Sequence, residues 1–102
     1  MWLIGITKSN KPEKRLKATF CKCKKKDECK GSNHKEVHFG QKGSKTFIDG
    51  RTEKEKDNYI ARHKVNENWK DATTAGALAR FILWNKKTLS ASISDFKKQF
   101  GI

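Results

Sequence analysis

The segment from residue 15 to residue 23 reads RLKATFCKC, and its pattern decides the fold of the first half of the chain. Three apolar residues, Leu16, Ala18 and Phe20, alternate with polar or smaller residues. A period of two is typical of a β-strand with one buried face, because successive side chains point to opposite sides of a sheet. We therefore predict a half-buried strand whose other face carries Lys17, Thr19, Cys21 and Cys23.

The segments on either side of this strand also have β-type patterns. Trp2–Thr7 is rich in aromatic and β-branched residues, and Lys35–Gln41 alternates like the central segment. A hairpin between the two alternating segments places Phe20 and Phe39 on one core face. Thr46–Ile48 follows a turn bracketed by glycines and is interpreted as a short final strand.

After residue 50 the apolar residues recur at helical spacing. Thr52 and Glu55 have the spacing of a capping box, which predicts the start of a helix. The expected fold is α+β in one domain, residues 1–102, since the length suits a single core. It comprises an antiparallel sheet of three to four strands (about 2–48) packed against three short helices (about 52–64, 74–86 and 89–100).

The composition excludes a membrane span and favours an anionic partner. The chain has 24 Lys and Arg against 11 Asp and Glu, a formal charge of +13, and 34% hydrophobic residues. No apolar run exceeds four residues, the length of the run at 81–84, which is far below the roughly 20 that a bilayer requires. The N-terminal apolar stretch is too short for a signal peptide, so we expect synthesis in a reducing cytoplasm.

The positive charge is densest between residues 8 and 30, and 20 of the 24 cations are lysines. Lysine suits a general anionic surface, whereas bidentate reading of a base favours arginine. We therefore predict binding to an anionic partner without base recognition. The candidate residues are Lys11, Lys14, Arg15, Lys17, Lys22, Lys24, Lys25, Lys26 and Lys30.

Three cysteines and two histidines lie close together in the sequence, and three interpretations of them remain open. Zinc prefers four thiolate or imidazole ligands, often from paired Cys-x2-4-Cys motifs, which this spacing lacks. A disulfide, Cys23 to Cys29, would close a hairpin loop, and free thiols are the preferred interpretation. We favour no metal site and expect no cofactor. The zinc candidates are Cys21, Cys23, Cys29, His34 and His38.

No group of residues points to catalysis. The Cys-His pairs lack an oxyanion hole and an orienting third residue, and Gly40-x-x-Gly43 lacks the Lys-Ser/Thr of a phosphate-binding loop. We therefore expect a protein that is not an enzyme.

Short strings with Trp, Gly and Arg-His run through residues 35–100: VHFG (37–40), YIARH (59–63), ENW (67–69), TAGAL (74–78), Arg80, LWNK (83–86) and FKK (96–98). This pattern resembles small, basic, largely uncharacterised proteins encoded by large nucleocytoplasmic DNA viruses, including those that infect algae. Residues 21–33 look like an insertion that many such proteins lack, which argues against a shared metal site. The matching residues suit a scaffold, with Trp69, Trp84 and Leu83 as anchors and Gly76 at a close contact. Arg62 and Arg80 are candidates for pairing with Glu67, Asp71 or a carboxylate of a partner.

The resemblance implies a viral setting and a component of the virus particle. We expect a virion structural protein, a minor capsid or internal component, that binds acidic surfaces of other virion proteins after synthesis in the host cytoplasm. The alternative is a protein that binds the viral genome nonspecifically through phosphate contacts. A contiguous lysine face would favour the second function, and mixed polar and apolar patches the first. The sequence leaves the oligomeric state open.

Overall fold

A computed structural model describes residues 2–22, 34–65 and 67–102, and it confirms the α+β fold. Three antiparallel strands, β1 (Trp2–Lys8), β2 (Lys14–Cys21) and β3 (His34–Gln41), form a sheet in the order β1-β2-β3. Each strand pairs with its neighbour along the chain, as in a meander.

The register of β2 and β3 places the alternating apolar residues on one face. Leu16 lies opposite Phe39, and Ala18 lies opposite Val37. Phe20 and Phe39 are both fully buried, which confirms that they share the core side of the hairpin.

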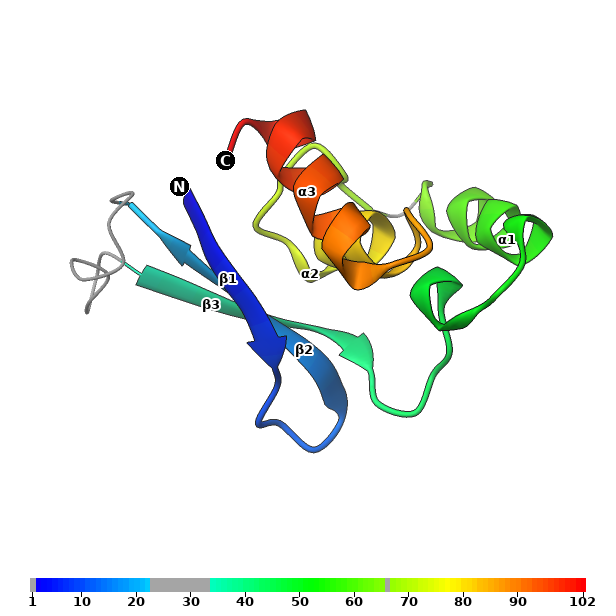
Figure 1. Cartoon of the computed structure of the whole chain (residues 1–102), viewed down its shortest axis with the longest axis horizontal. Coiled ribbons are helices and arrows are strands. Elements are labelled where there is room, and N and C mark those ends of the chain that lie inside the picture. Colours follow the sequence, from blue (N-terminus) through cyan, green and yellow to red (C-terminus); the bar gives the residue numbers. More distant parts are fainter. Residues whose placement is uncertain (1, 23–33, 66) are drawn as a thin grey trace.

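Helical segments from the second half of the chain cover this face (Figure 1). They are α2 (Ala75–Leu78), the π-helical turn η4 (Ala79–Leu83) and α3 (Leu89–Phe100). Thr88 caps α3 by accepting a hydrogen bond from the amide of Ala91. The core they form with the sheet consists of Leu3, Ala18, Phe20, Phe39, Leu78, Ile82, Leu83 and Phe96.

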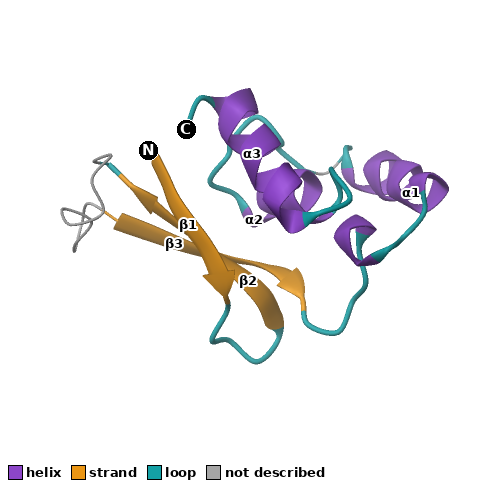
Figure 2. Ribbon diagram, in the orientation of Figure 1, coloured by secondary structure: helices purple, strands orange, loops and turns teal. Residues whose placement is uncertain are grey.

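The helix α1 (Glu53–His63) lies beside this core, farther from the sheet than α3 (Figure 2). Thr52 and Glu55 form the expected capping box at its start. One side of α1 holds it to the rest of the protein: the Nζ atom of Lys56 donates to the carbonyl of Asn85 at 2.9 Å, and Tyr59 is buried. The opposite side of α1 is therefore left for other contacts.

Two expected elements differ from those observed. Thr46–Ile48 is not a strand, because Phe47–Asp49 forms a 3-10 helix, η3. The backbone amide and the hydroxyl of Thr46 both donate to the Asp49 carboxylate, at 2.8 and 2.9 Å, which closes a local turn instead of extending the chain. The helix expected over 74–86 ends at Leu83, where the amide of Trp84 bonds to the carbonyl of Ala79, five residues back. Among the described residues, no helix has the length and apolar composition needed to cross a bilayer.

Candidate anion-binding groove

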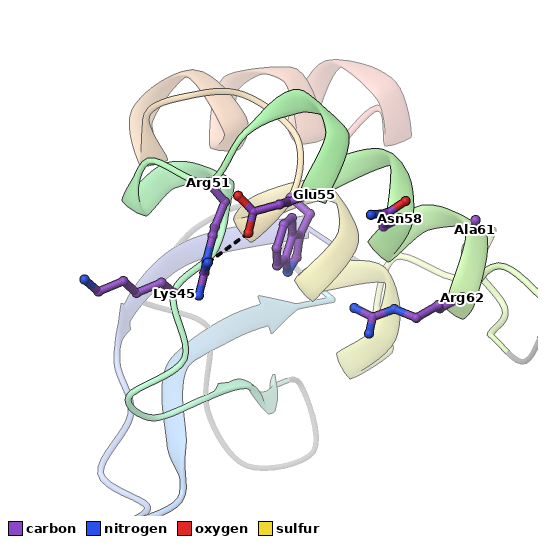
Figure 3. Close-up of a pocket in the computed structure, with 7 residues that line it drawn as sticks. Lys45, Arg51, Glu55, Asn58, Ala61 and Arg62 are labelled. Carbon is purple, nitrogen blue, oxygen red and sulfur yellow. Dashed lines mark hydrogen bonds and ion pairs between the residues drawn. The ribbon is translucent and has the colours of Figure 1, made fainter.

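An open groove of about 630 Å³ lies beside α1 (Figure 3). Glu55, Asn58 and Arg62 follow one another at helical spacings of three and four residues, so α1 presents all of them on one face. Figure 3 shows Lys45 and Arg51 on one side of the groove and Arg62 on the other, with its guanidinium group directed toward the middle. The full lining is Lys45, Arg51, Glu55, Asn58, Ala61, Arg62 and Trp84.

Glu55 is the carboxylate that lines the groove, and its oxygens already have partners. Its Oε1 atom accepts from the amide of Thr52 at 3.2 Å and its Oε2 atom from Arg51 Nη1 at 2.8 Å. The Thr52 amide and hydroxyl, together with the nearby Arg51 guanidinium, hold the pKa of Glu55 below its usual value. In the described chain, by contrast, Lys45 and Arg62 form no ion pair. The groove therefore presents two unpaired cations to an incoming anion.

Trp84 contributes an indole to the groove, and other rings hold that indole in place. Its ring lies parallel to the Tyr59 ring, with centroids 4.7 Å apart and an interplanar angle of 8°. Tyr59 also stacks with His63, at 4.2 Å. Burial, and then the charge of Glu67, raise the pKa of Tyr59 to about 12, so the phenol is neutral at physiological pH.

Two of the scaffold residues expected from the sequence, Trp69 and Gly76, lie against the side chain of Glu67. The indole of Trp69 donates to Glu67 Oε2 at 2.8 Å, and His63 Nδ1 lies 3.3 Å from Glu67 Oε1. Gly76 gives room for this carboxylate, because a Cβ atom there would lie 2.8 Å from Glu67 Oε2. The close contact at Gly76 is thus with a side chain.

Arg80 does not form the carboxylate pair expected for it. Its Nη1 atom donates to the carbonyl of Trp84 at 2.7 Å, and its guanidinium group lies over the rings of Phe81 and Trp69, at 4.9 and 5.7 Å. Within the described residues its Nε atom is buried without a hydrogen-bond partner. Arg80 therefore fixes the end of η4 and the position of Trp84.

The basic residues predicted to bind an anion do not form one free surface. Arg15 makes two hydrogen bonds to Asp49, and Lys17 pairs with Glu36 at 2.8 Å. The ammonium group of Lys17 donates to Glu36 and lowers the pKa of that carboxyl. Lys11 and Lys22 are exposed and Lys14 is half-buried, whereas Lys24, Lys25, Lys26 and Lys30 lie outside the described residues.

The described part of the zinc candidate set does not form a metal site. Cys21 is buried and disulfide-bonded, so its sulfur is not a thiolate ligand, and the interpretation of Cys21 as a free thiol is wrong in this structure. His34 and His38 are four residues apart on β3, which separates them by about 13 Å. Among the described residues no three His, Cys, Asp or Glu side chains are placed to hold a metal ion. Cys23 and Cys29 lie outside those residues.

One Ser-His contact has the distance of a nucleophile and base. The Ser9 hydroxyl lies 2.7 Å from His38 Nδ1, but Ser9 is buried and its oxygen also accepts from the amide of Lys11 at 3.1 Å. These partners place Ser9 in the turn between β1 and β2, where it fastens the turn to β3.

Sequence reasoning missed the groove because it sought positive charge by density along the chain. Lys45, Arg51 and Arg62 lie outside the predicted set, which was drawn from the more densely basic residues 11–30. The helical spacing of Glu55, Asn58 and Arg62 is a weak indication that they share one face of a helix. No feature of the neighbouring sequence predicts that Trp84 lies beside them.

A family model matches more than half of the chain, residues 4–63; its description is "Family of unknown function (DUF5754)". The chain belongs to DUF5754. The DUF5754 match covers most of β1 and all of β2, β3, η3 and α1, and with them every groove residue except Trp84. The helices that bury the core face of the sheet lie beyond it. No match was found among curated proteins or among solved structures.

Proposed function

We propose that this protein is a non-enzymatic nucleic-acid-binding protein whose principal contact surface is the groove beside α1. The observation that carries this proposal is that the unpaired cations Lys45 and Arg62 share a groove with the indole of Trp84. Cationic side chains bind phosphates and release the counterions that surround the nucleic acid, while aromatic side chains stack on the faces of bases. A nucleotide would contact both the cations and the ring, through its phosphates and its base.

The kinds of cation in the groove also support a phosphate ligand. Most of the positive residues in the chain are lysines, yet two of its four arginines, Arg51 and Arg62, line this groove. A guanidinium group can hold a phosphate with two parallel hydrogen bonds, whereas an ammonium group acts as a point charge. The formal charge of +13 would steer a polyanion toward the protein from a distance.

The test is the salt dependence of binding to nucleic acid for two triple variants of equal charge. The groove variant replaces Lys45, Arg51 and Arg62 with Gln, and the control replaces Lys54, Lys97 and Lys98, which are exposed and do not line the groove. Each lost phosphate contact should reduce the slope of log K against log salt by about 0.7–0.9. We expect a slope reduced by about two in the groove variant and much less in the control. Equal slopes in the two variants would refute the groove as the contact surface.

A second function, that of a virion structural protein, is favoured by another surface feature. A groove of about 410 Å³ has mixed lining, with the apolar Phe100 and Ile102 beside Lys70 and Asp71. Mixed patches of this kind suit a protein partner, and the viral resemblance supplies a setting for one. Nuclease treatment of opened particles distinguishes the two functions. Release of the protein with the digested genome supports nucleic-acid binding, and retention on empty shells supports the structural role.

A further inference from the structure

We infer that the groove beside α1 takes an unpaired nucleotide, with its base against Trp84 and its phosphates on Arg62 and Lys45, and that the protein therefore prefers single-stranded nucleic acid to duplex. This inference rests on the proposed function and adds the form of nucleic acid to it. It depends on the fixed position of the indole, on the free cations around it and on the size of the groove.

The indole of Trp84 is held before any ligand arrives. Tyr59 covers one face of its ring at 4.7 Å, and Arg80 bonds to the backbone carbonyl of the same residue at 2.7 Å. Trp84 is only partly buried and lines the groove, so part of its indole is open to a ligand there. Little side-chain entropy is lost when a base stacks on a ring that is already fixed.

The cations stand where the phosphates on either side of such a base would pass. Arg62 and Lys45 lie on opposite sides of the groove (Figure 3). Arg51 forms an ion pair with Glu55 at the edge of the groove. This pairing lowers the repulsion between the Glu55 carboxylate and an incoming anion. Asn58 adds an amide, which has both a donor and an acceptor for the edge of a base.

The size of the groove and the geometry of a duplex both favour a single strand. The groove's volume of about 630 Å³ falls within the 300–1,000 Å³ range common for small-ligand pockets. In a duplex the base faces are stacked on one another, and exposing one of them costs unstacking and unpairing energy. A single strand offers its base faces at little cost, and stacking is tolerant of sequence because every base has a π-face.

The experiment compares the affinity of the full chain for an oligothymidylate of about 20 nucleotides with that for a duplex of the same length, by fluorescence anisotropy at one salt concentration. We expect the single strand to bind at least about tenfold more tightly, in keeping with one stacked base. Trp84→Leu should remove most of this preference, while Trp84→Phe, which keeps a ring on Tyr59, should retain part of it.

Charge variants give an independent measurement that does not require changing a packed ring. Arg62→Gln and Lys54→Gln each remove one positive charge from α1, but only Arg62 lines the groove. We expect Arg62→Gln to weaken single-strand binding several-fold more than Lys54→Gln. Equal or tighter binding of the duplex by the unmodified protein would overturn this inference and leave the proposed function standing. Failure to bind either form would overturn both.

Discussion

The guanidinium group of Arg15 on β2 holds the carboxylate of Asp49 at the end of η3 through two hydrogen bonds, of 2.5 and 2.7 Å. The same carboxylate accepts from the amide and hydroxyl of Thr46, which is buried. Asp49 therefore joins the sheet to the segment that leads into α1. Because Lys45 and Arg51 flank this segment, the pair also fixes one side of the groove.

This pair predicts a loss of stability in acid. The hydrogen bonds from Arg15, and then from Thr46, hold the pKa of Asp49 well below its usual range. An unfolded Asp titrates near 3.9, so the folded state binds fewer protons than the unfolded state below that pH. The stabilisation is thus complete above about pH 4 and is lost as the pH falls toward the folded pKa.

Urea unfolding of Asp49→Asn at neutral and acid pH measures this contribution. We expect the variant to be about 1–2 kcal/mol less stable at pH 7, because a charge-assisted pair is lost, and the difference to narrow below about pH 4. Asp57→Asn is the matched control, since Asp57 is an exposed carboxylate on α1. A difference for Asp49→Asn that stays constant from pH 7 to acid would contradict the assignment.

The same Asp49 shows why one element of the fold was mispredicted. Thr46, Phe47 and Ile48 all favour strands as residue types, but the spacing from Thr46 to Asp49 is that of a capping box, as it is from Thr52 to Glu55. The strand propensity of three residues is weak. The hydrogen bonds within the turn outweigh it, because they satisfy the polar groups of this segment without pairing to the edge of the sheet. The alternating segments were predicted correctly, since burying one face of a sheet fixes a period of two.

The site was less predictable than the fold for a different physical reason. Capping and alternation depend on residues within a few positions of one another, whereas the groove depends on the packing of Tyr59 against Trp84, 25 residues apart in sequence. Arg15 and Lys17 show the converse error. Both lie in the most basic segment, yet each is paired with an acidic residue that is distant in sequence and near in space.

Two glycines are predicted to respond differently to substitution by alanine. Gly40 has φ +77°, and a Cβ atom there would lie 2.8 Å from the Leu83 side chain and 3.2 Å from Arg15 Cβ. Gly40→Ala should therefore cost about 2–4 kcal/mol, from backbone strain together with overpacking. At Gly76 the atom in the way is the end of the Glu67 side chain, which can move.

For Gly76→Ala two effects nearly cancel. Displacing Glu67 loses its hydrogen bond from Trp69, worth about 1 kcal/mol, and alanine in place of glycine in α2 regains about the same. We expect a net change within about 1 kcal/mol in chemical denaturation. A cost at Gly76 equal to that at Gly40 would show that Glu67 is held rigidly and cannot give way.

The last prediction uses Tyr59, the single tyrosine of the chain, to test the packing of its ring against Trp84 beside the groove. Burial, and secondarily the Glu67 carboxylate, raise the pKa of Tyr59 to about 12, whereas a tyrosine in an unfolded chain titrates near 10. The folded pKa lies above the unfolded one, so its contribution to stability is complete below about pH 10 and is lost as the pH rises toward 12.

Tyrosinate absorbance measured against pH gives the titration midpoint directly, with circular dichroism as the check that the chain is still folded. We expect little tyrosinate at pH 10–11 in the folded protein and a normal midpoint near 10 in denaturant. Glu67→Gln should lower the folded midpoint while leaving it above the denatured one, because burial is the larger cause. A folded midpoint near 10 would mean that the Tyr59 phenol is open to water, and the packing that fixes Trp84 at the groove would then be wrong.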